Sequence, residues 1–356
     1  MTGSVQRLAV VGAGAWGTAL AITVHRAGRK SLIWARDSAL AAHLSGHHEN
    51  PVYLPGIALD PAIRASADLT AAAESDAVLL AVPAQHVRAI AGNLAAVLRN
   101  GQPVIVCAKG IERGSNALLS AVLAEVLPDS PVAVLSGPTF AGEVARGLPT
   151  AVTLAAADPV LAAVLVEALG SRAFRPYLSD DPVGAQIGGA VKNVIAIACG
   201  IVAGRTLGAN AGAALITRGL AEIVRLGRAM GARPETLMGL SGLGDLTLTC
   251  TSAQSRNFSL GQALGAGASL DAALAGRRTV AEGLHSAAAV VGLAARHGVE
   301  VPIADWSTTT APGCAGTNTS WISELLPEPA TPVITVNTPV GRSTLTSRRL
   351  FTVAFR

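Results

Sequence analysis

A glycine-rich stretch near the start of the chain constrains its fold more than any other feature. An apolar run at residues 8–11 leads into Gly12-Ala-Gly14-Ala-Trp-Gly17, and helix-forming residues follow. The pattern Gly-x-Gly-x-x-Gly between an expected strand and an expected helix predicts a dinucleotide-binding turn. Gly12 permits the tight turn, Gly14 leaves room for a pyrophosphate, and Gly17 lets the helix pack close to the strand. The free N–H groups at the helix N-terminus would bind the phosphates. The alternative is a glycine-rich turn that binds nothing.

Strand-like and helix-like segments alternate as far as residue 180. After the first strand, short apolar strands are expected at 31–35, 76–82, 103–107, 132–135, 150–156 and 172–177. Such alternation is typical of a doubly wound α/β sheet. We therefore predict a Rossmann-like dinucleotide-binding domain over residues 1–180.

From Asp181 onward the pattern is helical. Asp181 suits an N-cap and Pro182 suits the first helical position, so a long helix is expected to begin there. Gly188 and Gly189 in its middle predict close approach by a ligand or another helix, because glycine is otherwise costly inside a helix. We predict an all-helical domain over residues 181–305.

Composition limits the class of protein. Of 356 residues, 50% are apolar and 14% charged, so a large core can be buried. The net charge is only +4 and aromatic residues make up 3%, which argues against a nucleic-acid partner. The most apolar long stretch contains Lys192 and Asn193, so no membrane insertion is expected. The chain enters its first strand too early for a signal peptide, which predicts a cytoplasmic protein.

The cysteines and histidines give little support for a metal site. The four cysteines lack the spacing of metal ligands, and they fit a reducing compartment. His43, His47 and His48 lie close to Glu49, where a metal is conceivable, but a solvated helix end is favoured. We predict no metal.

Several candidate residues follow expected strands. Arg36 comes after the second strand, where it can stack on an adenine and pair with a 2′-phosphate. Asp37 could instead accept hydrogen bonds from a ribose, but it is expected to cap the next helix. Both NADP and NAD therefore remain open as cofactors. Tyr53 lies in a turn-rich segment that could form a flap near the cofactor.

Lysine is rare in this chain. It occurs only at residues 30, 109 and 192 among 27 basic residues, so a retained lysine suggests a role that arginine cannot fill, such as proton transfer. Lys109 follows an expected parallel strand, at the edge where ligands bind, although a solvent-facing lysine is the alternative. Lys192 lies on the long helix.

Two later segments look suited to anions. Ser255-Arg256-Asn257 opens a helix with a hydroxyl cap, a bidentate cation and an amide, which predicts a phosphate or carboxylate site, although an ordinary capped helix is possible. The segment 136–143 is rich in glycine and carries a hydroxyl. Residues 240–250 are expected to form a flexible glycine loop that carries one acid, Asp245.

Together these motifs resemble the bacterial NAD(P)-dependent glycerol-3-phosphate dehydrogenases. The matching stretches are GAGAWGTALA from Gly12, AVPAQ from Ala81, KGIE from Lys109, SGPTFAGEVARGLPTA from Ser136, GAVKNVIAIACGI from Gly189, GLSGLGDLTLTCTSAQSRN from Gly239 and VAEG from Val280. The family joins a Rossmann-like domain to a helical domain like the C-terminal domain of 6-phosphogluconate dehydrogenase. It reduces dihydroxyacetone phosphate to sn-glycerol 3-phosphate for phospholipid synthesis.

The resemblance implies a set of site residues. Beyond the three fingerprint glycines, cofactor contacts are implied for Ala15, Trp16, Arg36, Tyr53, Lys109, Ala141, Arg256, Val280 and Glu282. Substrate contacts are implied for Lys109, Gly137, Thr139, Lys192, Asp245, Ser255, Arg256 and Asn257. The family often has serine at the place of Ala15, so only the backbone N–H of that residue could serve here. Lys192 is implied as the general acid/base.

The chemistry agrees with this assignment, because hydride transfer to a ketone leaves charge on oxygen that a nearby ammonium can stabilise and protonate. Two other hypotheses stay open: a β-hydroxyacid or 6-phosphogluconate-type dehydrogenase, and a dinucleotide-sensing protein without turnover. A homodimer is a further possibility. The chain departs from the family after Ala304, where members continue with a helical segment. Residues 306–356, rich in Thr, Ser and Pro, predict a poorly packed tail.

Overall fold

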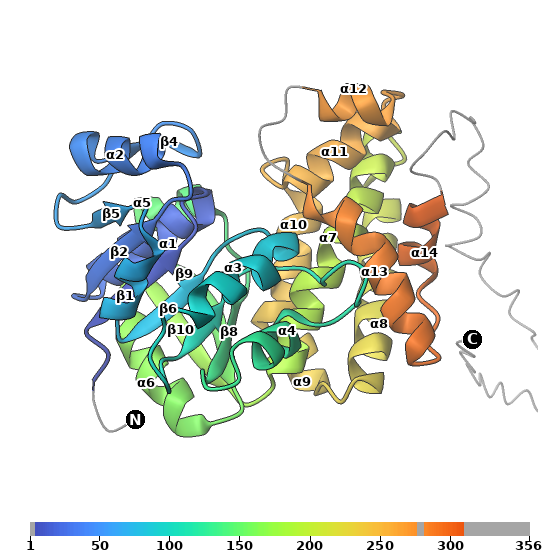
Figure 1. The fold of residues 1–356 in the computed structure, drawn as a ribbon. Helices are drawn as coiled ribbons and strands as arrows, with labels where there is room; N and C mark the ends of the chain where they lie inside the picture. Colours follow the sequence, from blue (N-terminus) through green and yellow to red (C-terminus); the bar gives the residue numbers. More distant parts are fainter. Residues whose placement is uncertain (1–3, 276–280, 310–356) are drawn as a thin grey trace, which may run out of the picture. The chain divides into compact units, whose positions relative to one another are not determined.

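The structure is a computed structural model that describes residues 4–275 and 281–309. The chain divides into two compact units, Met1–Thr317 and Asn318–Arg356, and the second lies outside the described residues. The first unit contains a layered α/β domain followed by a group of helices (Figure 1). The predicted fold class is therefore confirmed.

The α/β domain is built on an eight-stranded sheet with the order β10-β9-β8-β7-β6-β1-β2-β5. Its strands are β1 (Arg7–Val11), β2 (Lys30–Trp34), β5 (Arg64–Ser66), β6 (Ala77–Leu80), β7 (Val104–Val106), β8 (Val132–Ser136), β9 (Thr150–Ala156) and β10 (Phe174–Ser179). All neighbours pair in parallel except β8 and β9, which are antiparallel. The apolar runs predict the strands. However, a strand that is buried on both faces has the same apolar pattern whether it pairs in parallel or antiparallel, so the direction of β9 could not be predicted. The sequence also misses β5, a short polar strand at the edge of the sheet.

Helices cover both faces of the sheet. Leu8 and Val10 pack in one layer with α1 (Ala15–Arg26), α2 (Ser38–His47), α5 (Ala141–Arg146) and α6 (Pro159–Leu169). Ala9 and Val11 pack in the other with α3 (Val87–Ala95) and α4 (Leu119–Val126). Successive side chains of a strand point to opposite faces, so one short apolar strand contributes to both layers. Short 3₁₀ turns at Leu69–Glu74 and Ala84–His86 and a hairpin of β3 (Glu49–Asn50) and β4 (Leu54–Ala58) complete the described α/β domain.

One long helix, α7 (Pro182–Gly204), forms the centre of the helical domain. The other helices are α8 (Ala209–Ala229), α9 (Pro234–Leu237), α10 (Asp245–Thr251), α11 (Arg256–Gly265), α12 (Leu270–Leu274), α13 (Glu282–Arg296) and α14 (Pro302–Thr309). Asp181 caps α7 as predicted, because its Oδ1 accepts the Gly184 N–H at 2.7 Å. By length and composition α7 could cross a membrane, but 83% of its most apolar window is buried in the protein. It packs against α8, α10, α11 and α13 (Figure 1).

The glycines inside α7 mark close packing, as predicted. A Cβ on Gly188 would lie 2.3 Å from the Ser241 carbonyl oxygen, and one on Gly200 would lie 2.1 Å from the Phe258 carbonyl oxygen. The backbones of α10 and α11 and the turn before them can therefore approach α7 more closely than larger side chains would allow. This close packing brings Asp245 and Thr249 of α10 within hydrogen-bonding distance of Lys192 on α7.

The predicted flexible loop at residues 240–250 is wrong. A π-helical turn, Leu240–Gly244, leads directly into α10, whose first residue is the buried Asp245. The glycines serve close packing here: a Cβ on Gly242 would lie 1.8 Å from the Leu237 carbonyl oxygen. The local rule that reads such glycines as loop formers cannot detect this tertiary contact.

The end of the helical domain differs slightly from the expected boundary. Helix α14 continues beyond residue 305 to Thr309, and Val301, Ile303 and Ala304 at its start are buried. Glu222 of α8 accepts the Ile303 N–H at 2.7 Å. The rest of the predicted tail, residues 310–356, lies outside the described residues.

Candidate functional site

A cleft of about 740 Å³ opens between the carboxyl edge of the sheet and the helical domain. Residues that follow four parallel strands line one wall, among them Gly12 after β1, Arg36 after β2, Val82 after β6 and Lys109 after β7. Ligands of open α/β sheets bind at this edge. The opposite wall comes from α7, α10, α11 and the start of α13.

The glycine fingerprint has the geometry that a dinucleotide needs. Gly12 has φ +120°, and a Cβ on it would lie 2.7 Å from the Ala81 carbonyl oxygen. A Cβ on Gly17 would lie 1.8 Å from the Gly12 carbonyl oxygen, whereas one on Gly14 would meet no atom within 4 Å. Gly12 and Gly17 therefore permit the tight turn, and Gly14 keeps the cleft side open. Helix α1 has no side-chain cap, so its first N–H groups are available to a phosphate. These residues fit a dinucleotide.

The segment after β2 presents a cation to the same cleft. Asp37 caps α2, as predicted, by accepting the Ala39 N–H at 2.9 Å and the Leu40 N–H at 3.4 Å. Its carboxylate is thereby engaged with the backbone, and Arg36 lines the cleft beside it. Tyr53 in the β3–β4 hairpin also lines the cleft.

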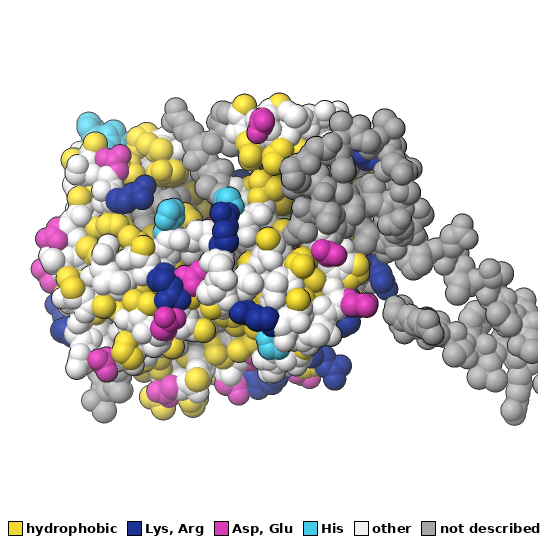
Figure 2. All heavy atoms as spheres, turned by 45° about the vertical axis from the view of Figure 1, so that its right-hand side comes forward, with side chains coloured by type: hydrophobic (Ala, Val, Ile, Leu, Met, Phe, Trp, Pro, Cys, Tyr) yellow, Lys and Arg dark blue, Asp and Glu magenta, His cyan; other side chains and the backbone are white. Residues whose placement is uncertain are grey.

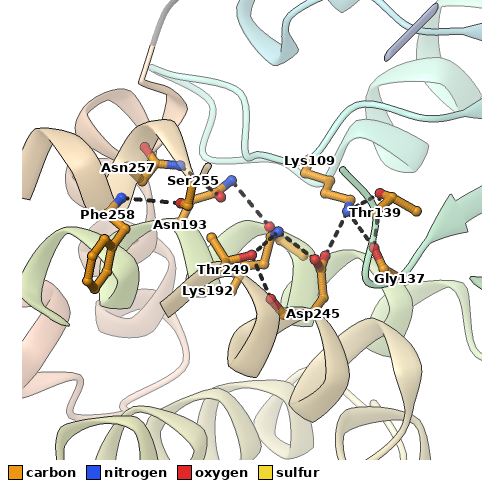
Figure 3. Close-up of polar contacts among 11 residues, drawn as sticks. Lys109, Gly137, Thr139, Lys192, Asn193, Asp245, Thr249, Ser255, Asn257 and Phe258 are labelled. Carbon is orange, nitrogen blue, oxygen red and sulfur yellow. Dashed lines mark hydrogen bonds and ion pairs between the residues drawn. The ribbon is translucent and has the colours of Figure 1, made fainter. Parts of the chain in front are cut away.

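Two lysines share one buried carboxylate at the centre of the cleft (Figure 3). Lys192 Nζ of α7 lies 2.6 Å from Asp245 Oδ1, and Lys109 Nζ lies 2.8 Å from Asp245 Oδ2. Asp245 is fully buried, whereas both lysines line the cleft. Lys192 also donates to Thr249 Oγ1 at 2.7 Å. Lys109 donates to the Gly137 carbonyl at 2.7 Å and lies 3.2 Å from Thr139 Oγ1, so the loop after β8 fixes its position.

Burial lowers the pKa of Lys192 from 10.5 to about 8, although Asp245 opposes the shift and Lys109 adds to it. Desolvation favours the neutral amine, because a charge loses its hydration inside the protein. An ammonium with a pKa near 8 can donate a proton at neutral pH, and the amine can take one back. A group of this kind is suited to a reaction that moves a proton.

The start of α11 lines the cleft. Ser255 caps the helix, as predicted, by accepting the Phe258 N–H at 3.2 Å (Figure 3). Arg256 and Asn257 follow and line the cleft. The Asn257 amide donates to Asn193 Oδ1 at 2.9 Å and accepts the Gly283 N–H at 3.0 Å, which ties α11 to α7 and α13.

The cleft is also lined by a second carboxylate, that of Glu282. Glu282, the first residue of α13, lines the cleft, and a Cβ on Gly110 would lie 3.7 Å from its Oε2. Burial raises the pKa of Glu282, while the charges of Arg256, Lys192 and Lys109 oppose the rise.

The structure brings most of the predicted site residues to one cleft. Those that line it are Gly12, Gly14, Ala15, Trp16, Arg36, Tyr53, Lys109, Thr139, Ala141, Lys192, Ser255, Arg256, Asn257 and Glu282. Gly17, Gly137 and Asp245 lie directly behind these residues and hold them in place. Val280 lies outside the described residues.

Two residues that contact the site side chains were not singled out from the sequence. Thr249 holds Lys192, and Asn193 accepts from Asn257. The signal for Thr249 is its spacing of four residues from Asp245, which places both on one face of a helix. The incorrect loop prediction for that segment hid this spacing.

Charged side chains outside the cleft form surface pairs, such as those of Arg88 with Glu112 and Glu125. Figure 2 shows Lys and Arg side chains interspersed with Asp and Glu over the described part of one face. The rings of His43 and His47 stack with centroids 4.4 Å apart. Within residues 4–275 and 281–309, no group of three or more His, Cys, Asp or Glu side chains could hold a metal ion.

Comparison with known proteins agrees with this geometry. Two family profiles match the chain: the N-terminus of NAD-dependent glycerol-3-phosphate dehydrogenase over residues 7–162, and its C-terminus over residues 181–308. The glycerol-3-phosphate dehydrogenase [NAD(P)+] of Parvibaculum lavamentivorans is 56% identical over 315 residues, covering 88% of this chain and 95% of that protein. The Rhodospirillum rubrum enzyme of the same name is 60% identical over 300 residues, covering 84% of this chain and 86% of that protein.

A solved structure extends the agreement to the fold. The crystal structure of glycerol-3-phosphate dehydrogenase from Coxiella burnetii superimposes with a TM-score of 0.85 at 38% identity, covering 90% of this chain and 99% of that chain. The sequence matches span both domains, and the described cleft lies within them. The chain belongs to the NAD-dependent glycerol-3-phosphate dehydrogenase family.

Proposed function

We propose that this protein uses NADPH or NADH to reduce dihydroxyacetone phosphate to sn-glycerol 3-phosphate. The observation that carries the proposal is the position of the Lys192–Asp245–Lys109 cluster. It lies in a cleft that a dinucleotide-binding turn and the anion-binding start of α11 also line. Reduction of a phosphorylated ketone needs an anion site and a proton donor beside a hydride-donating cofactor, and residues suited to each of these three roles line this one cleft.

The cofactor would lie along the carboxyl edge of the sheet. The N–H groups at the start of α1 would bind its pyrophosphate, and Arg36 would face the adenosine end. Arg36 could pair with a 2′-phosphate there, and Asp37, which caps α2, lines the cleft beside it, so the site suits both NADPH and NADH. The cofactor-binding residues that we propose are Gly12, Gly14, Ala15, Trp16, Gly17, Arg36, Tyr53, Lys109, Ala141, Arg256, Val280 and Glu282.

The substrate phosphate would bind at the start of α11. Arg256 supplies a bidentate cation there, and the N–H groups of the helix supply the positive end of its dipole. These phosphate contacts lie away from the carbon that receives the hydride. Their binding energy therefore orients the carbonyl of the substrate. We assign substrate contacts, direct or through a neighbour, to Lys109, Gly137, Thr139, Lys192, Asp245, Ser255, Arg256 and Asn257.

Lys192 would act as the general acid. When bound, the reduced nicotinamide supplies a hydride to the carbonyl carbon. As the C=O bond becomes a C–O single bond, Lys192 gives a proton to the oxygen and becomes a neutral amine. Two N–H groups of its ammonium are directed to Asp245 and Thr249, which leaves the third for the substrate oxygen. Lys109 would stabilise the same developing charge.

The wider assignments rest on family membership and composition. We propose that residues 1–180 form the cofactor domain and residues 181–305 the substrate domain. We also propose that the enzyme works in the cytoplasm as a homodimer, without inserting into membranes, and that its product feeds phospholipid synthesis.

The test is a spectrophotometric assay of NADPH and NADH oxidation by the purified full-length protein with dihydroxyacetone phosphate. We expect turnover that Lys192→Met abolishes, while NADPH binding, measured by fluorescence titration, is retained. Arg256→Ala should raise the KM for dihydroxyacetone phosphate, and a surface control, Arg228→Ala, should change nothing. Cofactor binding without any turnover in the unaltered protein would refute the proposal.

A further inference from the structure

We propose that Asn50 is a positioning residue that orients the Gly14 amide toward the phosphates of the dinucleotide. The proposal rests on the cofactor site described above and adds a residue remote from the glycine fingerprint. Asn50 ends the short strand β3, and it does not line the cleft itself.

The Asn50 side chain is fully buried and uses both ends of its amide. Its Nδ2 donates to the Ala13 carbonyl at 2.9 Å and to Thr18 Oγ1 at 2.8 Å. Its Oδ1 accepts the Tyr53 N–H at 3.1 Å. The two donated bonds use both amide hydrogens, so the orientation of the side chain is fixed.

The bond to the Ala13 carbonyl determines how the next amide points. The peptide between Ala13 and Gly14 is planar, and the described chain contains no cis peptide bond. In a trans peptide the C=O and the N–H point in opposite directions. Because the Ala13 carbonyl points toward Asn50, the Gly14 N–H points away from it. Gly14 lines the cleft, and the space beside its Cα is open. The Gly14 N–H is therefore held as a phosphate donor before the cofactor arrives.

The other contacts of Asn50 extend this effect. Thr18 closes the first turn of α1, because its N–H donates to the Gly14 carbonyl at 2.9 Å, the first hydrogen bond of the helix. Tyr53 lies in the hairpin and lines the cleft. Asn50 thus connects the phosphate-binding turn, the start of α1 and the Tyr53 segment. Loss of its side chain frees all three at once.

The experiment measures NADPH binding directly, by fluorescence titration of the purified full-length protein. We expect Asn50→Ala to weaken NADPH binding about tenfold, because a preorganised donor is lost and the Ala13 carbonyl is left without its partner. Thr18→Val keeps the bond to Ala13 and should have a smaller effect. In steady-state kinetics, Asn50→Ala should raise the KM for NADPH and leave the KM for dihydroxyacetone phosphate unchanged.

The matched control is Gln102→Ala. Gln102 is another buried amide of the same domain, with bonds from its Nε2 to the Ala72 and Ser75 carbonyls, and it does not line the cleft. It should lower the melting temperature comparably without changing the NADPH dissociation constant. Equal NADPH affinity in Asn50→Ala and the unaltered protein, or equal weakening by Gln102→Ala, would overturn the role of Asn50 alone. An unaltered protein that binds no dinucleotide would overturn the cofactor site as well.

Discussion

Replacing Asp245 with asparagine tests the central electrostatic claim about the site. At 2.6 Å, and with an effective dielectric constant of about 20, the attraction between Lys192 Nζ and the Asp245 carboxylate is about 6 kcal/mol. One pKa unit corresponds to about 1.4 kcal/mol, so even a third of this attraction would change the pKa of Lys192 by more than one unit. The charge of Lys109 acts in the same direction once the carboxylate is gone. We therefore expect Asp245→Asn to lower the pKa of Lys192 from about 8 to about 7 or below.

The assay is the pH dependence of kcat/KM for dihydroxyacetone phosphate with NADPH. Reduction requires the protonated lysine, so in the unaltered protein the rate should fall as the pH rises through about 8. Oxidation of sn-glycerol 3-phosphate requires the neutral amine, so its rate should rise over the same range. In Asp245→Asn both limbs should shift to lower pH by at least about one unit.

The matched control is Asp180→Asn. Asp180 pairs with Arg233 on the surface, away from the cleft, and its loss should leave both limbs unchanged. NADPH titration should confirm that Asp245→Asn is still folded. If that variant is folded and active but its kcat/KM still falls near pH 8, the carboxylate does not control the pKa of Lys192 and the reasoning is wrong.

Three further predictions concern other parts of the chain. Arg36→Gln should raise the KM for NADPH about tenfold while sparing NADH, because a charged hydrogen bond to the 2′-phosphate is lost; equal effects in steady-state assays with the two cofactors would contradict this. Burial raises the pKa of Glu222 from 4.5 to about 7, so stability should fall as pH rises between these values, and Glu222→Gln should flatten that slope in thermal melts. Truncation after Asp305 keeps the buried Ile303 and Ala304 and should change the melting temperature little; a large loss would show that residues 306–356 are structural.

Local signals predicted the elements that carry the cofactor loop. The Asp37, Asp181 and Ser255 caps and the contact of Gly17 with the Gly12 carbonyl all lie within a few residues along the chain, and the structure confirms these local roles. The direction of β9 was not predictable, because strand pairing depends on residues far apart in sequence.

The helical segment that carries Asp245 shows the opposite case. Gly242 and Gly244 are read locally as loop formers, yet Gly242 permits contact with the Leu237 carbonyl. Only the folded backbone shows that Asp245 begins a helix, that Thr249 lies one turn later, and that both contact Lys192. The identity of the acid was predictable from the sequence, but its burial and its position at the start of a helix were not.

The use of lysine in this chain follows from the same geometry. Arginine supplies nearly all of its basic residues, yet two of its three lysines meet at one buried carboxylate. A guanidinium stays charged at any physiological pH and so cannot give up a proton, whereas burial lowers the pKa of the Lys192 ammonium to about 8. In the proposed mechanism Arg256 shows the complementary choice, because an anion site needs a permanent, bidentate charge. The proposed roles thus assign proton transfer to a lysine and phosphate binding to an arginine within a single cleft.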